Sequence, residues 1–178
     1  MKEYKVPFGE GEDELVEKKS RFISHIYKIT TAAEANELLA ARKKEYWDAS
    51  AIVYAYVLRD GTMRFSDDGE PQGTAGMPTL EMLRKEEIND VLCITVRYFG
   101  GTKLGAGGLT RAFGKAAKMA LDAAGVAVMQ PHVKVTIDCP YNMLDVIRQR
   151  FETFESTEDN IEYGASVVFT VYMPTGRF

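Results

Sequence analysis

One stretch, residues 91–124, constrains the fold of this chain more than any other. It reads VLCITVRYFGGTKLGAGGLTRAFGKAAKMALDAA. Val91–Tyr98 is an almost continuous run of apolar and β-branched residues, which is typical of a strand covered on both faces. From Leu109 the apolar residues follow a helical period, and Gly125 marks the end of that helix. The expected buried face of the helix comprises Phe113, Ala116, Ala117, Ala120, Leu121 and Ala124.

Five glycines separate this strand from the helix: Gly100, Gly101, Gly105, Gly107 and Gly108. Such a loop before a helix offers backbone N–H groups and a helix dipole to an anion. No Asp or Glu occurs between Arg97 and Leu121, whereas basic residues recur there. The alternative is a glycine-rich turn that only lets the helix pack closely on the sheet. We favour an anion or nucleic-acid site formed by Arg97, Tyr98, Lys103, Gly105, Gly107, Gly108, Arg111 and Lys115.

This loop matches neither of the two familiar phosphate-binding motifs. No glycine is followed by Lys-Ser or Lys-Thr in the frame that a P-loop requires. The segment Gly105–Thr110 also ends in threonine where the Rossmann fingerprint has glycine or alanine. The chemistry of the loop therefore has to be argued from its own residues.

A second unusual loop, residues 65–76, reads FSDDGEPQGTAG and contains Asp67, Asp68 and Glu70. These carboxylates would suit Mg²⁺ or a pairing with the basic loop. The other interpretation is an Asx-type turn whose acids face water. We favour the turn over a metal site, because the spacing matches no known cage and no histidine lies nearby. We expect neither a metal nor a cofactor.

Composition narrows the class of protein. The net charge is −4 at pH 7, which argues against a generally basic nucleic-acid coat. Cys93 and Cys139 lie in apolar runs and are interpreted as buried thiols, as in a reducing compartment. No apolar run reaches the length of a membrane span, and the first residues lack the apolar region of a signal peptide. We therefore expect a cytoplasmic protein without membrane contact.

Outside residues 91–124 the pattern alternates between strands and helices. Thr31 and Glu34 form a capping box that predicts a helix start. After residue 130 we predict a β-α-β-β segment with one exposed sheet face, in which residues 161–171 alternate as in a long strand. The predicted strands before residue 80 are Tyr4–Val6, Phe22–Ile29, Ala51–Leu58 and Met63–Phe65, and the later elements contain Val133–Cys139, Leu144–Phe154 and Ile161–Val171.

Three segments resemble the IMPACT/YigZ family, and in particular its bacterial members: KKSRFI at residues 18–23, FSDDGEPQGTAG at 65–76 and RYFGGTKLGAGGLTRAFG at 97–114. The resemblance implies an α+β fold. Residues 1–130 would form an Impact N-terminal-type α/β sandwich, similar to the second domain of a small-subunit ribosomal protein. Residues 131–178 would form a small ferredoxin-like domain similar to the last domain of elongation factor G. That domain is expected to be incomplete, because the chain ends before a further helix and strand.

The resemblance also implies a function linked to translation, since eukaryotic relatives regulate translation and nucleic-acid or ribosome binding is suggested for bacterial ones. One departure is Ala51, which stands where family members commonly have a histidine. Two functions stay open. The favoured one is a non-enzymatic regulator that binds RNA, the ribosome or a translation factor through the basic loop and helix. The alternative is a phosphate- or nucleotide-binding enzyme, GHMP-kinase-like or a hydrolase, that uses the glycine loop with Asp67 or Asp68.

Overall fold

The computed structural model describes residues 2–177, which divide into two compact units between Val128 and Met129. The residues before Tyr4 group with the second unit. Within residues 2–177, no helix is both long and apolar enough to cross a membrane. The elements that begin in the first unit are β1 (Tyr4–Pro7), β2 (Gly11–Glu17), β3 (Ser20–Lys28), α1 (Ala32–Glu45), β4 (Ala51–Val57), β5 (Met63–Ser66), α2 (Gly76–Lys85), β6 (Val91–Tyr98), α3 (Gly105–Ala124) and β7 (Val126–Met129), whose last residue groups with the second unit.

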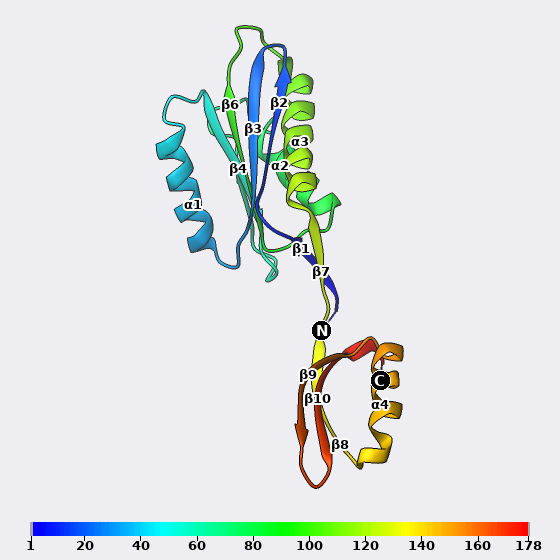
Figure 1. Ribbon diagram of the computed structural model, residues 1–178. Coiled ribbons are helices and arrows are strands. Elements are labelled where there is room, and N and C mark those ends of the chain that lie inside the picture. Colours follow the sequence, from blue (N-terminus) through cyan, green and yellow to red (C-terminus); the bar gives the residue numbers. More distant parts are fainter. Residues whose placement is uncertain (1, 178) are drawn as a thin grey trace. The chain divides into compact units, whose positions relative to one another are not determined.

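The first unit is a five-stranded antiparallel sheet in the order β2-β3-β6-β4-β5. Helix α1 covers one face of the sheet, and α2 and α3 cover the other (Figure 1). Strand β6 lies at the centre, so the prediction of a strand covered on both faces is confirmed. The short strands β1 and β7 pair separately with each other. The expected mixed helix-and-strand fold is therefore confirmed.

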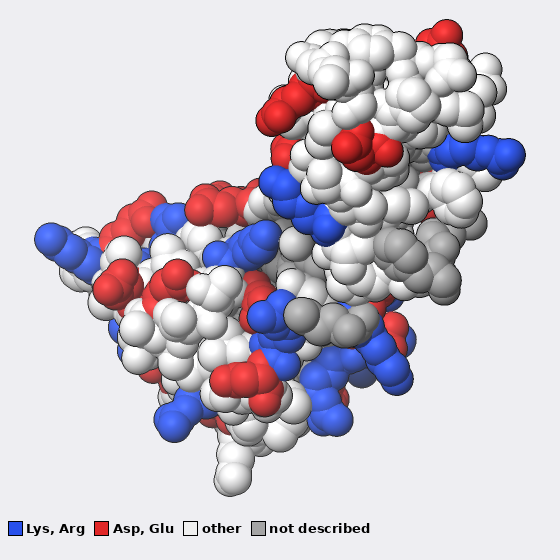
Figure 2. All heavy atoms as spheres, turned by 90° about the horizontal axis from the view of Figure 1, so that it is seen from below, with Lys and Arg blue, Asp and Glu red and all other residues white. Residues whose placement is uncertain are grey.

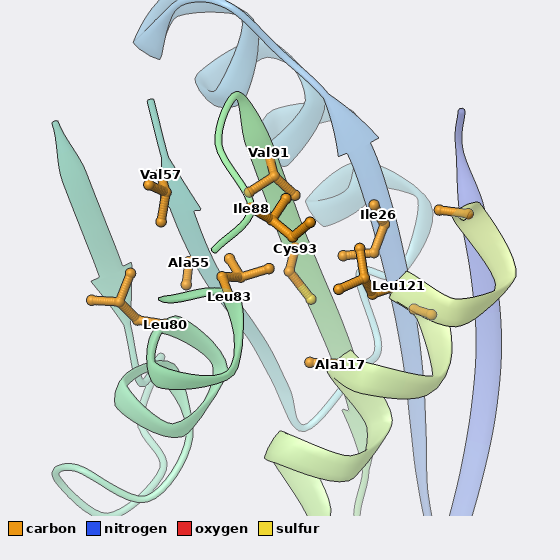
Figure 3. Close-up of a cluster of buried hydrophobic side chains, with 12 residues drawn as sticks. Ile26, Ala55, Val57, Leu80, Leu83, Ile88, Val91, Cys93, Ala117 and Leu121 are labelled. Carbon is orange, nitrogen blue, oxygen red and sulfur yellow. The ribbon is translucent and has the colours of Figure 1, made fainter. Parts of the chain in front are cut away.

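The core of this unit follows from the strand and helix periods. Apolar side chains of β3, β4 and β6 face those of α2 and α3, as Figure 3 shows for Ile26, Cys93 and Leu121. All six residues expected on the buried face of α3 are buried. Helix α3 also lies very close to β2. A Cβ atom at Gly11 would come within 2.3 Å of the Ala124 backbone nitrogen, so this position accepts no side chain.

Helix α1 begins as the sequence predicts. The Thr31 side chain accepts a hydrogen bond from the Glu34 backbone, and the Glu34 side chain reaches back to the cap backbone. Both halves of the capping box are therefore present, which satisfies backbone N–H groups that the first turn leaves without helical partners.

The sequence prediction missed two strands and misplaced a helix start. Strand β2 was missed because it is an edge strand in which only Leu15 is buried, so it lacks the expected apolar alternation. Strand β7 is short and was not foreseen. Helix α3 begins at Gly105 and not at Leu109, so three of the five glycines lie in its first turn. The helix includes these glycines despite their low helix propensity, which is why the apolar period placed its start too late.

The second unit contains β8 (His132–Cys139), the 3₁₀ turn η1 (Tyr141–Met143), α4 (Leu144–Thr153), β9 (Thr157–Tyr163), β10 (Val167–Pro174) and the 3₁₀ turn η2 (Thr175–Arg177). Its antiparallel sheet has the order β8-β10-β9, and its core joins Phe151 of α4 to Val167, Phe169 and Val171 of β10. The predicted β-α-β-β order after residue 130 is confirmed, but residues 161–171 do not form one long strand. A tight turn, in which the Gly164 N–H donates to the Ser166 carbonyl, splits this segment into a hairpin.

Two glycine substitutions should have opposite effects on stability. Gly114 lies inside α3, and an added Cβ would meet no atom within 4 Å. We expect Gly114→Ala to raise the free energy of unfolding by about 1 kcal/mol, the usual helix-propensity difference. Gly100→Ala should lower it by about 1–3 kcal/mol, because the new Cβ would lie 2.1 Å from the Lys19 carbonyl carbon. Urea denaturation measures both, and changes of the same sign would contradict the packing described here.

Candidate nucleic-acid interface

The N-terminus of α3 is open to solvent. The residue before it, Leu104, makes no side-chain hydrogen bond to the first turn, and Gly105, Ala106 and Gly107 are exposed. Gly105 has a φ of 77°, a left-handed conformation that favours glycine. The first N–H groups of a helix have no helical acceptor, and the helix dipole adds positive potential there. The end of α3 can therefore attract an anion.

The β2–β3 hairpin meets the loop that leads into α3. Lys18 and Lys19 form its turn with φ values of 46° and 66°. The Gly100 N–H donates to the Ser20 hydroxyl at 3.1 Å, and Gly100 packs directly on the Lys19 backbone. Both segments lie at the same end of the sheet (Figure 1). This contact places two lysines near the start of α3.

Five exposed cations surround this end of the sheet, and none of them has an ion-pair partner within residues 2–177. We refer to them as the basic cluster: Lys18, Lys19, Lys103, Arg111 and Lys115. Three of them line one cavity of about 270 Å³ together with Leu15, Glu17 and Leu104. By contrast, the face drawn in Figure 2 has Lys and Arg interspersed with Asp and Glu. The basic cluster is thus a local feature of an acidic protein.

The sequence pattern predicted Lys103, Arg111 and Lys115 as residues of the site, but not Lys18 and Lys19 of the hairpin. Their basic character was visible, yet their position depends on the β2–β3 pairing, and β2 was not predicted. The predicted glycines Gly105, Gly107 and Gly108 do lie beside the cluster, as the first turn of α3.

Arg97 does not join the basic cluster. Its side chain is only 8% exposed, and Nη1 donates to both carboxylate oxygens of Glu70 at 2.7 and 2.8 Å. The guanidinium also contacts the rings of Phe22 and Phe99, at 5.5 and 5.6 Å from their centroids. Its charge is therefore neutralised inside the protein and is not offered to a ligand as a free surface cation.

Tyr98 lies on the opposite face of the sheet from Arg97, because neighbouring residues of a strand alternate. Its ring packs with the core beneath α1, and its hydroxyl donates to Asp48 at 2.8 Å. The structure therefore does not bring this predicted site residue to the start of α3.

The acidic loop, residues 65–76, is held together by its own carboxylates. Asp67 accepts hydrogen bonds from the backbone N–H groups of Gly73, Ala75 and Gly76 at 2.8–3.2 Å. Asp68 accepts one from the Ile52 N–H at 2.7 Å. Their role in the structure is to fix the loop. The two loops do meet, but through Glu70 and Arg97 and not through Asp67 or Asp68. Within residues 2–177, no group of three acidic, His or Cys residues is arranged to hold a metal.

A second polar cluster surrounds His25 on the α1 face. This side chain is buried, its Nδ1 lies 3.2 Å from a Glu12 oxygen, and its Nε2 has no hydrogen-bond partner within residues 2–177. Burial and, secondarily, the Arg42 charge lower the pKa of His25, while Glu12 and Glu45 oppose them. Burial has the larger effect, so the ring is neutral at pH 7 despite the nearby carboxylate.

The buried ion pair generates a prediction about stability. Glu70→Leu should lower the free energy of unfolding by about 3–5 kcal/mol, because Arg97 is left as an unpaired buried charge. The double variant Glu70→Leu/Arg97→Met should recover most of that loss, since an apolar pair needs no desolvation of charge. Glu14→Gln, which breaks the exposed pair with Arg21, serves as the control and should change little. Additive losses in the double variant, measured in urea, would contradict this account.

The lowered pKa of His25 predicts acid sensitivity. Below about pH 6.5 the unfolded chain binds a proton at this residue more readily than the folded protein does. Stability should therefore fall as the pH decreases from about 6.5 towards the lower folded pKa. His25→Gln should flatten that part of the profile, whereas His132→Gln, at an exposed position of the second unit, should not. Thermal melts at half-unit pH steps measure how the melting temperature depends on pH. Identical profiles for the wild type and His25→Gln would refute the role of His25 in acid sensitivity.

Comparisons with known proteins agree with this architecture. The Impact N-terminal domain matches residues 18–121, and a domain of unknown function, DUF1949, matches residues 137–178. IMPACT family member YvyE of Bacillus subtilis is 39% identical over 165 residues, which cover 92% of this chain and 76% of that protein. IMPACT family member YigZ of Escherichia coli is 32% identical over 164 residues, which cover 90% and 80%.

A solved structure, described as the crystal structure of a hypothetical protein, is similar over almost the whole chain. Its TM-score is 0.70 at 30% identity, and the match covers 99% of this chain and 88% of that one. The domain match spans more than half of the sequence and includes the hairpin lysines, the acidic loop and most of α3. This chain therefore belongs to the IMPACT family.

Proposed function

We propose that this chain is a non-enzymatic, translation-linked regulatory protein that binds RNA, free or in the ribosome, through the basic cluster. The observation that carries the proposal is the meeting of five cations, none of them ion-paired within residues 2–177, around the open N-terminus of α3. Phosphate groups are the natural ligands of such an arrangement. The translation link comes from the role that the family resemblance implies.

The net charge of −4 is compatible with this proposal. Exposed charges are screened over about 8 Å at physiological ionic strength, so a phosphate at α3 responds mainly to nearby groups. Two lysines enter from the hairpin, one from the loop, and Arg111 and Lys115 from one side of α3. Cations on separate segments can contact successive phosphates of one strand, which favours a polynucleotide over a single phosphate group.

The enzymatic alternative has less support. It requires Asp67 or Asp68 to act at the glycine loop, but both carboxylates are already engaged. Asp67 accepts backbone hydrogen bonds from its own loop, and Asp68 accepts one from the Ile52 N–H of β4. The first turn of α3 consists of Gly105, Ala106, Gly107 and Gly108, none of which carries a nucleophilic or basic side chain. No observation favours phosphoryl transfer or hydrolysis over binding.

RNA binding should depend steeply on salt. Each phosphate contact with a single strand contributes a slope of about −0.7 in a plot of log affinity against log salt. Lys103→Ala and Lys18→Ala should each weaken binding and reduce the slope by about one contact, because each removes one cation of the cluster. Fluorescence anisotropy with a labelled single-stranded RNA, measured between low and physiological salt, provides both quantities.

Lys43→Ala is the matched control, because Lys43 is exposed on α1 and also lies outside every ion pair found in residues 2–177. It should leave affinity and slope almost unchanged. Equal losses from Lys43→Ala and Lys103→Ala would indicate diffuse attraction and no defined surface. If the wild type binds no RNA at low salt, the proposal fails, and a protein such as a translation factor becomes the better candidate for the partner.

A further inference from the structure

A second cavity, of about 340 Å³, lies at the start of α3 and is distinct from the one between Lys18 and Arg111. Its walls come from three segments: the acidic loop, the end of β6 with the residues that follow it, and the first turns of α3. The lining residues are Glu70, Pro71, Arg97, Phe99, Lys103, Leu104, Gly105, Ala106 and Leu109. Pockets for small ligands occupy roughly 300–1,000 Å³, so this one suits a single compact group.

Phe99 gives the cavity a flat aromatic wall. The residue directly follows β6 and is 50% exposed, whereas all residues of that strand except the partly buried Tyr98 are buried. Its backbone is held in place, because the Phe99 N–H donates to the Ser50 hydroxyl at 2.9 Å. Arg97 lies 5.6 Å from the ring centroid. A half-exposed aromatic ring on an anchored backbone, beside a basic surface, is an arrangement on which proteins stack unpaired bases.

The cavity also offers a cation that a purely apolar ligand would not use. This cation is not Arg97, whose guanidinium lines the cavity but is buried and paired with Glu70. Lys103 supplies an exposed cation next to the open first turn of α3. The ligand that matches these walls therefore combines a flat aromatic part with an anionic part. A nucleotide has both.

We propose that this cavity holds one unstacked nucleotide of a single-stranded RNA, with its base on Phe99 and its phosphate beside Lys103 and the first turn of α3. The inference rests on the proposed function and adds where a base is bound. Leu104 lines both cavities, so they adjoin. The strand then continues from the base site towards Arg111 and Lys115, which bind further phosphates.

Phe99→Leu in the full chain tests the base contact, because leucine keeps an apolar side chain but removes the aromatic face. Loss of one base–aromatic stack weakens single-strand binding about tenfold. We expect that loss for an octauridylate RNA, with an unchanged salt slope, because no phosphate contact is removed. An abasic oligonucleotide with the same phosphates should bind the wild type and Phe99→Leu equally. Trp47→Leu, at an aromatic residue that is 82% exposed outside the cavity, should have no effect.

Ala106→Leu provides an independent test, because it fills the cavity from the helix side without removing an aromatic ring or a cation. It should also weaken octauridylate binding about tenfold. If both variants bind like the wild type while Lys103→Ala weakens binding, RNA binding stands and the base site is refuted. Equal wild-type affinity for uridine 5′-monophosphate and for the octamer would assign the cavity to a free nucleotide and also overturn the inference. Absence of any RNA binding by the wild type overturns the proposed function itself.

Discussion

The buried ion pair between Arg97 and Glu70 is the interaction on which the arrangement at the start of α3 depends. It joins the end of the central strand to the acidic loop, 27 residues earlier in the chain. The Arg97 guanidinium also approaches Ser20, whose hydroxyl accepts the Gly100 N–H and so fixes the hairpin. Because breaking a buried pair leaves an uncompensated charge, these three segments are held to one geometry.

This arrangement separates two kinds of positive charge that look alike in the sequence. Arg97 is neutralised inside the protein and organises the loops around it. The basic cluster keeps its charges exposed, and its cations are spread over a hairpin, a loop and a helix. The net charge of the chain does not distinguish the buried, paired arginine from the exposed cations. Position relative to the sheet decides which cation supports the structure and which can reach a ligand.

Local pattern predicted the elements whose neighbours bury them. The apolar run of β6 and the helical period of α3 needed no knowledge of the rest of the chain. Strand β2 could not be recognised, because it is an edge strand whose acidic side chains are exposed to water and give no apolar alternation. The partner of Arg97 was also beyond sequence reasoning. Strand alternation fixes which face a residue occupies, but not which distant carboxylate meets it there.

The turn of the β2–β3 hairpin has a consequence for how this protein tolerates change. Lys18 and Lys19 both adopt a left-handed backbone conformation, which costs less energy in an Asn-Gly pair. A chain selected for stability alone would tend to lose both lysines at this turn. Under the proposed function, the two lysines combine an unfavourable backbone conformation with a surface charge that binding requires. Replacing both lysines by Asn-Gly would raise the melting temperature but would remove two of the five exposed cations. Stabilised variants of this family should therefore be inspected first at this turn.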